Sequence, residues 1–411
     1  MAFFSCETKR QFTSKPSKSV ANPDSDLLEV NGVAYHVDDT SSIIFVEIIN
    51  ENLIYKRPDT TAAFYAELRV SYKLLPEQGS RKIIDSSSSY LFDRANEKVE
   101  IKSLATIFKT KAKIGNNYYL EIQVFDLNKK VKYTKGLNIY KQNNYSEQNF
   151  LVRAKDQVSF TNRFLENEIV TIEIKNTNIS KITIDCFFKN FPPAAPPFSV
   201  KAPDELKYMP DSFFILPLST KEFTLRMPKH GFYHVRTNNQ SNEGLTLFTY
   251  DKTFPGVSNV DEMINCTRYI MNKAEFEEYK SAENKKEAID KFWVIIGGSN
   301  ERAKELLKRY YGRVKEANKY YSGYTQGWKS DRGMIFIVFG PPNNIYKSTS
   351  NEIWIYGLES NPNALRYVFY KTRNPFSDND YILERSQFFK DPWYLAVDTW
   401  RQGHVYLNKD R

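Results

Sequence analysis

Apolar and polar positions alternate along much of the first 255 residues, and this two-residue period predicts short β-strands. Residues 43–49 form a β-branched run, while residues 64–72 and 118–125 place apolar side chains on one face. Turn-forming residues lie between these segments, for example at 76–79. No helical period of comparable strength intervenes. The pattern predicts an antiparallel, Ig-like β-sandwich over residues 28–148.

The same alternation resumes and predicts a second β-sandwich over residues 149–257. Cys186 falls on the apolar face of an alternating segment, so we expect a buried small hydrophobe rather than a reactive thiol. Residues 191–197 read Phe-Pro-Pro-Ala-Ala-Pro-Pro, and four of these positions cannot donate to a β-ladder. We expect a stiff extended connection between strands; a recognition segment for an aromatic groove is the alternative.

From Ser258 onward the apolar spacing changes to the helical period, and Ser258 with Asp261 resembles a helix cap. Gly297 and Gly298 separate two predicted helices. The second helix begins near Ser299 and carries one apolar stripe: Ala303, Leu306, Leu307, Tyr310, Tyr311, Val314, Ala317 and Tyr321. Residues 334–339, 353–356 and 365–370 are predicted strands of a sheet on which the helices pack. Residues 258–411 are therefore predicted to form a helical segment plus an α+β domain, which makes the whole chain multi-domain and mainly β.

The composition narrows the functional classes. Twenty-seven Tyr and 29 Phe among 411 residues favour strands and broad contact surfaces, whereas only 16 Gly argue against glycine-rich nucleotide cradles. No apolar run approaches the 18 residues of a membrane-spanning helix. The formal charge is +9, but 58 basic and 49 acidic residues are interleaved, so we expect no nucleic-acid partner. Three cysteines make no disulfide framework; whether Cys186 and Cys266 bridge stays open.

The first 27 residues resemble the processed end of a bacterial lipoprotein precursor. Ser5 stands directly before Cys6, the candidate lipidation site, and apolar aromatic residues precede both. The following polar segment has linker composition, which suits a tether between an acyl anchor and a folded body. A full signal peptide also needs a basic start and a longer apolar region, which we expect upstream of Met1. The alternative is a frayed terminus with an incidental thiol.

Candidate catalytic and metal-binding residues are few. His230 and His234 lie four apart, a spacing that metal ligands use, but the sequence around them is strand-like and offers neither a paired carboxylate nor a thiolate. We therefore expect structural roles for both, and neither a metal nor another cofactor. Local signatures of serine hydrolases, zinc proteases and phosphate loops are absent from the sequence. A hydrolase built from distant Asp and Glu residues leaves no such signature and stays open.

Residues 327–333 read Gly-Trp-Lys-Ser-Asp-Arg-Gly and run into the apolar segment 334–339, which ends at Gly340, Pro341 and Pro342. This order predicts a tight turn before a buried strand that the glycine and prolines terminate. In the turn, Asp331 can accept backbone donors and Arg332 can pair with a carboxylate. Trp328 is expected to cover the end of the strand.

This stretch resembles the GWxTD-domain family, whose signature is Gly-Trp-x-Thr-Asp-Arg-Gly, a strand, and Tyr-Gly-Pro-Pro. Ser330 stands where the family has Thr, and Phe339 where it has Tyr. Residues 352–356, 391–393 and Trp400 extend the resemblance, which covers roughly residues 262–405. It implies secreted or lipid-anchored proteins of Gram-negative bacteria, notably Bacteroidota, with no established reaction. The motif positions are thus expected to be structural or binding residues, none catalytic: Gly327, Trp328, Asp331, Arg332, Gly333, Gly340, Pro341 and Pro342.

These observations together predict a non-enzymatic, lipid-anchored outer-membrane protein. We expect it to be an accessory or scaffold subunit of an envelope complex for β-barrel insertion, secretion or transport. The alternatives are a glycan-binding envelope lipoprotein and an envelope hydrolase with an unrecognised carboxylate site. One acid and two bases directly after Cys6 favour the periplasmic face over the cell surface.

Overall fold

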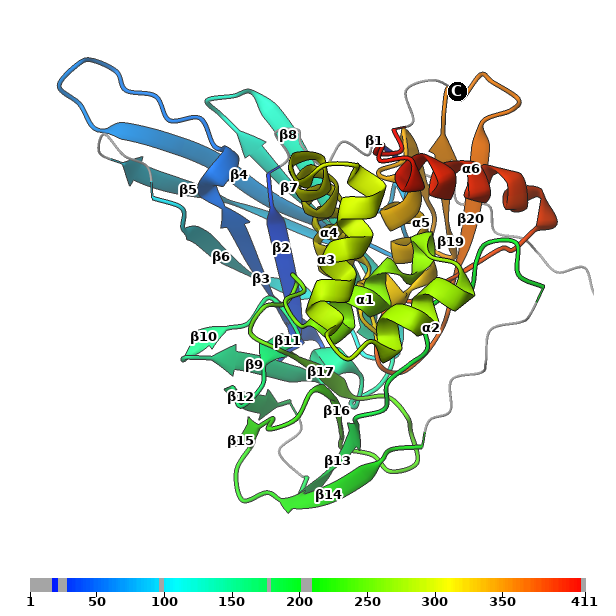
Figure 1. The fold of residues 1–411 in the computed structure, drawn as a ribbon. Coiled ribbons are helices and arrows are strands. Elements are labelled where there is room, and N and C mark those ends of the chain that lie inside the picture. The colour runs from blue at the N-terminus through cyan, green and yellow to red at the C-terminus, as the bar shows by residue number, and fades with distance from the viewer. Residues whose placement is uncertain (1–16, 21–27, 96–99, 176–178, 201–208, 408–411) are drawn as a thin grey trace, which may run out of the picture.

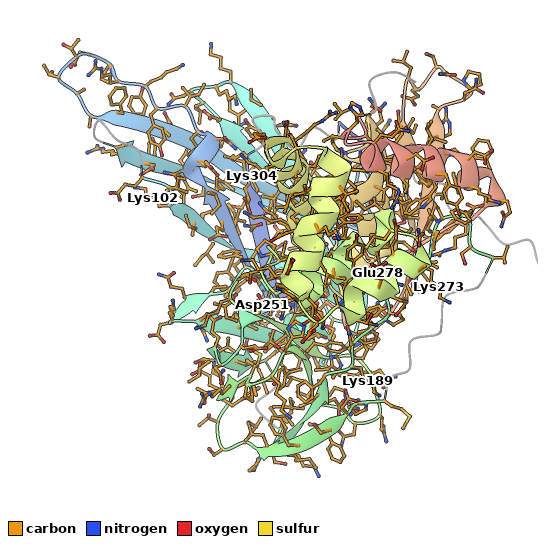
Figure 2. The ribbon with its side chains drawn as sticks, in the orientation of Figure 1. Lys102, Lys189, Asp251, Lys273, Glu278 and Lys304 are labelled. Atoms are coloured by element: carbon orange, nitrogen blue, oxygen red, sulfur yellow. The ribbon has the colours of Figure 1, made fainter. Side chains whose placement is uncertain are left out.

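The computed structural model describes residues 17–20, 28–95, 100–175, 179–200 and 209–407, so Cys6 lies outside the described residues. Strands make up 38% and helices 24% of the structure, which confirms the predicted multi-domain, mainly β class. Figure 1 shows two strand-rich regions, blue to cyan and green, followed by helices and a further sheet in yellow to red. Figure 2 places charged side chains on all these parts, for example Lys102 on the first strand-rich region and Lys304 on the helices.

The first sandwich packs a three-stranded sheet, in the order β2-β3-β6, against a four-stranded sheet, in the order β5-β4-β7-β8. All pairings are antiparallel. Alternate side chains of both sheets, such as Val46, Val70 and Ile122, are fully buried between them because successive strand residues face opposite sides. The strands are β2 (Val30–His36), β3 (Ser41–Ile49), β4 (Phe64–Leu75), β5 (Asp85–Ala95), β6 (Ser103–Lys111), β7 (Asn116–Asp126) and β8 (Val131–Lys141).

The second sandwich packs sheet β10-β9-β12-β15 against sheet β11-β17-β16-β13-β14. Its pairings are antiparallel except that β11 runs parallel to β17. Cys186 is 3% exposed in this core, as predicted, and Cys266 lies in the C-terminal core, so the two thiols are free and buried apart. The strands are β9 (Phe150–Ala154), β10 (Gln157–Val158), β11 (Arg163–Leu165), β12 (Ile169–Ile174), β13 (Lys181–Phe187), β14 (Ser212–Pro217), β15 (Glu222–Arg226), β16 (Gly231–Arg236) and β17 (Leu245–Tyr250).

The C-terminal region packs helices on a five-stranded sheet in the order β1-β18-β19-β20-β21. The helix predicted near Ser299 is confirmed as α4, which Ser299 caps, and its apolar stripe faces the core. Gly298 ends the preceding helix in a left-handed conformation, φ 69°. The elements are α1 (Val260–Thr267), α2 (Lys273–Ser281), α3 (Lys285–Gly297), α4 (Asn300–Tyr321), α5 (Asp331–Phe339), α6 (Lys390–Arg401), β1 (Ser17–Val20), β18 (Asn344–Lys347), β19 (Asn351–Tyr356), β20 (Leu365–Lys371) and β21 (Tyr381–Leu383).

The strand predicted over residues 334–339 is wrong, because this segment lies in helix α5. All nine residues of α5 are buried, so the segment shows no amphipathic period, and a short apolar run fits a buried strand as well as a buried helix. The predicted cap of the first helix is also shifted by one residue. Asn259, not Ser258, caps α1, and its Oδ1 accepts from the Asp261 amide at 2.8 Å.

Part of the predicted polar tether belongs to the C-terminal sheet. Residues 17–20 form β1, which pairs antiparallel with β18 from Ser17 opposite Lys347 to Val20 opposite Asn344. Linker composition predicted no strand here. Strand pairing depends on backbone groups, which a polar segment supplies as well as an apolar one.

Lowering the pH from 7 to 5 is expected to destabilise the second sandwich. Burial lowers the pKa of His234 to about 4, against 6.5 for the free side chain. The folded state therefore keeps the neutral imidazole, and stability present above pH 6.5 is lost as the pH falls toward 4. The loss reaches about 2 kcal/mol at pH 5. Urea unfolding at both pH values should show it in the wild type and less in His234→Asn. His230→Asn, an exposed control, should keep the wild-type dependence; equal dependence in all three proteins would contradict the prediction.

Candidate functional site

The sequence motif forms a buried corner between α4 and α5. Its first three residues make a short 3₁₀ helix, Gly327–Lys329, which packs on the last turns of α4. The Gly327 amide donates to Ser322 Oγ at 2.8 Å, and the Trp328 amide donates to Asn318 Oδ1 at 3.0 Å. A Cβ on residue 327 would approach the Ala317 carbonyl well inside 3.0 Å. Glycine is therefore required by the close approach of two backbones.

Ser330 joins the corner to α5. Its hydroxyl accepts from the Gly333 amide at 3.0 Å, which caps helix α5. The same hydroxyl donates to the Gly327 carbonyl at 2.7 Å, which closes the turn. A threonine hydroxyl can make the same two bonds, which accounts for the family's Thr at this position. The Gly333 Cα lies so near the Gly327 carbonyl that a Cβ would again fall inside 3.0 Å.

Trp328 is the buried anchor of the corner and is only 2% exposed. Its indole donates to Gln326 Oε1 at 3.0 Å, and Gln326 Nε2 donates to Glu262 Oε1 on α1 at 2.7 Å. Tyr269 donates its hydroxyl to the Trp328 carbonyl at 2.9 Å. The predicted role, covering the end of a strand, is wrong because the following segment is a helix. Trp328 instead ties α1 to α5.

Asp331 links the corner to the last strand of the sheet. Its Oδ2 accepts from the Leu383 amide of β21 at 2.8 Å, and both carboxylate oxygens pair with the Arg385 guanidinium. The sequence predicted that Asp331 accepts backbone donors within the turn; in the structure its backbone donor comes instead from the distant strand β21. Burial raises the pKa of the Asp331 carboxyl, and the Arg385 charge opposes that shift.

Arg332 has the carboxylate partner that the sequence predicted. Its Nη1 lies 3.1 Å from Glu352 Oε1, and both side chains are almost fully buried. Its Nη2 donates to the carbonyl and side-chain oxygens of Asn379 at 2.9 and 2.6 Å. The guanidinium also lies over the rings of Tyr381 and Tyr321, 4.0 and 5.2 Å from their centroids. A buried ion pair with these contacts fixes α5 against β19.

Gly340 and the two prolines terminate a helix rather than a strand. Gly340 follows α5 with φ +82°, and its amide donates to the Phe336 carbonyl at 2.8 Å. Pro342 is buried and Pro341 exposed. The Arg313 guanidinium binds the end of α5 through the Ile337 and Val338 carbonyls, and it also donates to the Tyr406 carbonyl after α6.

Arg313 is a residue that the sequence reasoning missed. It lies on α4 three residues after Tyr310, so it falls on the apolar stripe of that helix. A charged residue on an otherwise apolar stripe was the available signal. Glu352 and Arg385 carried no such local signal.

Residues 191–198, here called the proline strap, cross the corner. The Ala194 amide donates to the Lys329 carbonyl at 2.8 Å, and the Ser386 amide donates to the Pro197 carbonyl at 3.1 Å. Arg385, which holds Asp331, also donates to the Ala195 carbonyl at 3.2 Å. The strap thus connects β13 to β14 without strand structure, as expected, and it also docks on the C-terminal domain.

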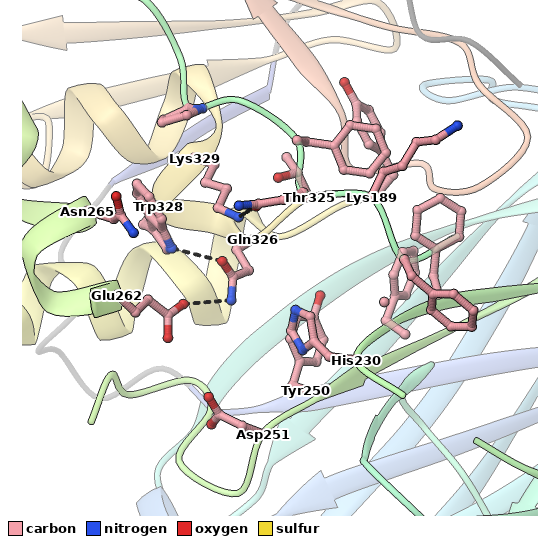
Figure 3. Close-up of a pocket in the computed structure, with 18 of the residues that line it drawn as sticks. Lys189, His230, Tyr250, Asp251, Glu262, Asn265, Thr325, Gln326, Trp328 and Lys329 are labelled. Atoms are coloured by element: carbon pink, nitrogen blue, oxygen red, sulfur yellow. Dashed lines mark hydrogen bonds between the residues drawn. The ribbon is translucent and has the colours of Figure 1, made fainter. Parts of the chain in front are cut away.

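A cavity of about 550 Å³ lies beside the strap. Figure 3 shows Glu262, Asn265 and Trp328 on one side of it, His230 with Tyr250 on another side, and Gln326 between them. Burial raises the pKa of Glu262 and lowers that of Lys329, another lining residue. The volume is typical of small-molecule sites, about 300–1,000 Å³.

The structure separates His230 from His234. His234 is buried in the second sandwich, where its ring nitrogens lie 2.9 Å from Thr246 Oγ1 and 2.8 Å from the Asn242 carbonyl. His230 instead lines the cavity beside Tyr250. In the part of the chain that the structure describes, no group of three or more His, Cys, Asp or Glu is placed to hold a metal ion. Among these residues, no helix is long and apolar enough to cross a bilayer.

Comparison with solved structures gives a red sea bream transglutaminase at 9% identity and a TM-score of 0.20, covering 55% of this chain. The match spans only 31% of the transglutaminase, and a likeness this weak carries no argument. A search of curated proteins gave no match.

Comparison with protein-family models gives a match. The model of the GWxTD domain matches residues 231–402, which contain the whole corner, α5 and the sheet strands β18 to β21. The match begins earlier than the residue 262 expected from the sequence, so it also includes β16 and β17 of the second sandwich. This chain is a GWxTD-domain-containing protein.

Proposed function

We propose that this protein is a non-enzymatic, lipid-anchored outer-membrane protein and acts as an accessory or scaffold subunit of an envelope complex. The complex would serve β-barrel insertion, secretion or transport. The observation that supports docking is the outer edge of β14. We propose that this edge binds an extended apolar strand of the partner protein by strand addition.

Among the described residues, strand β14 lies at the edge of its sheet and pairs only with β13. Its side chains are unusually exposed for their size: 63% for Phe213, 42% for Phe214 and 51% for Ile215. The Leu218 amide donates to the Ser180 carbonyl, and bonded positions alternate along an antiparallel pair. The backbone groups of Phe213 and Ile215 therefore point away from β13 and are available to another strand.

The charge pattern supports an apolar partner strand. Residues 212–220 contain no charged side chain, whereas edge strands of soluble proteins are commonly protected by lysine or other charges. Pro217 occupies an outward position, where its missing N–H costs no bond to β13. An uncharged, apolar and open edge fits an apolar strand better than a polar or charged one.

Strand addition can be tested on the full-length protein in envelope membranes. We expect Ile215→Lys to reduce recovery of the stoichiometric partner about tenfold or more, because a charge would be buried in the new ladder. Ile169→Lys is the matched control, since Ile169 is 57% exposed on an interior strand of the same sandwich. In the complex, the Phe213 and Ile215 amides should gain protection from hydrogen exchange. Equal recovery of both variants, or unprotected amides, would reject docking at β14.

The anchor is supported by Ser5-Cys6 and the polar residues that follow. Metabolic acyl labelling of the wild type and Cys6→Ser tests it directly. We expect the label only in the wild type, and equal labelling would remove the anchor from the proposal without affecting the β14 experiment.

A further inference from the structure

The cavity beside the proline strap is built from parts that lie far apart in the sequence. Its walls come from the strap, the ends of β16 and β17, α1 and the corner (Figure 3). The Phe191 ring of the strap stacks on Phe232 of β16 at 6.2 Å and meets Tyr324 edge-on at 5.0 Å. The strap backbone is also bonded to the corner through Ala194 and Lys329. These contacts hold the walls in place, so the cavity is formed before any ligand binds.

Three polar side chains of the cavity make no hydrogen bonds within the described part of the chain. They are the amide of Asn265, the hydroxyl of Thr325 and the imidazole of His230. Each of these groups both donates and accepts hydrogen bonds. A ligand hydroxyl has the same dual capacity, so a hydroxyl-rich ligand matches all three.

The charged residues of the cavity argue against an ionic ligand. Four acidic and four basic side chains line it, so neither sign prevails. The basic groups are already engaged: Lys329 with Asn190, Lys189 with Asp211, and both Arg268 and Lys280 with the ring of Phe276. A phosphate or carboxylate would have to compete with these contacts and would also face four carboxylates.

The cavity also has an apolar side. Phe191 and Tyr324 are half-buried there, and Tyr250 lies behind His230. Aromatic rings suit the C–H faces of a sugar ring, while its hydroxyls need polar partners at the rim. Both requirements are met in one cavity.

We propose that this cavity is a binding site for a neutral saccharide. Asn265, Thr325 and His230 hydrogen-bond to ligand hydroxyls, and Phe191 and Tyr324 pack on its C–H faces. Glu262 is held by Gln326 and supports the position of α1. The site is independent of docking at β14 and gives the GWxTD domain a ligand of its own.

The test uses the full-length protein with four neutral probes: maltotriose, cellotriose, mannotriose and chitotriose. Saturation-transfer NMR and calorimetry should detect at least one of them with a Kd below about 1 mM. Asn265→Ala should raise the Kd of that probe about tenfold, which corresponds to the loss of hydrogen bonds worth about 1.4 kcal/mol. Gln142→Ala removes an exposed amide outside the cavity and should leave the Kd unchanged. Melting curves confirm that both variants are folded.

Each contrary result is decisive. Failure of all four probes to bind the wild type at millimolar concentration would overturn the proposal, as would equal affinity of Asn265→Ala and the wild type. Displacement of a bound probe by inorganic phosphate or by trialanine would assign the cavity to an anion or a peptide instead. Ile215→Lys should bind the probe like the wild type, so failure of strand docking and failure of this site can be told apart.

Discussion

Gly333→Ala is expected to cost about 4 kcal/mol or more of unfolding free energy, enough to unfold the C-terminal domain. The added Cβ would lie well inside 3.0 Å of the Gly327 carbonyl. That carbonyl cannot withdraw easily, because Ser330 donates to it and Gly327 itself is pressed against α4. Denaturant unfolding followed by tryptophan fluorescence measures the loss, since Trp328 is buried at this corner.

Gly312→Ala is the matched control. Gly312 lies within α4, and an added Cβ there meets nothing within 4 Å. Alanine should therefore stabilise the protein by about 0.5–1 kcal/mol through its higher helix propensity. A Gly333→Ala protein within about 1 kcal/mol of the wild type would show that the corner is not the rigid element described above.

Arg332→Leu is expected to cost about 3–5 kcal/mol, because it leaves Glu352 charged and buried without its partner. In the wild type, burial raises the pKa of Glu352, but Arg332 and Lys347 outweigh burial and hold it below its ordinary value. Without Arg332 the Glu352 pKa should rise. The folded variant then gains a proton as the pH falls, so its deficit relative to the wild type should shrink between pH 7 and pH 5.

Two further variants separate the buried charge from a general packing loss. Arg332→Leu combined with Glu352→Gln should recover part of the stability, because no charge remains unpaired. Arg401→Leu breaks a partly exposed ion pair with Glu275 and should cost only about 1 kcal/mol or less. A deficit in Arg332→Leu that is independent of pH and unchanged by Glu352→Gln would contradict this account.

The motif that defines the family is thus an architectural element. Its glycines permit close backbone contacts, its hydroxyl caps α5, and its two charged residues reach β19 and β21. The two proposed binding surfaces lie beside it, in the cavity, or far from it, at β14. Variants of the motif are therefore expected to report on folding, whereas cavity and edge variants report on binding.

The sequence by itself determined the elements in which one face is buried and the other exposed. The alternation in β4 and β7 and the stripe of α4 are visible because burial on one side imposes a period. It also identified the motif and predicted that Arg332 pairs with a carboxylate, although it did not identify Glu352 as that carboxylate. It missed the strand β1, whose pairing depends on backbone groups that carry no composition signal.

Only the tertiary structure decided the rest. Segment 334–339 is apolar on all sides because α5 is buried on all sides, so no period distinguished a helix from a strand. The partners Glu352, Arg385 and Arg313 lie between 20 and 93 residues from the groups they hold, and nothing local links them. The cavity exists only where the strap, the second sandwich and α1 meet, because chain folding alone brings these distant segments together.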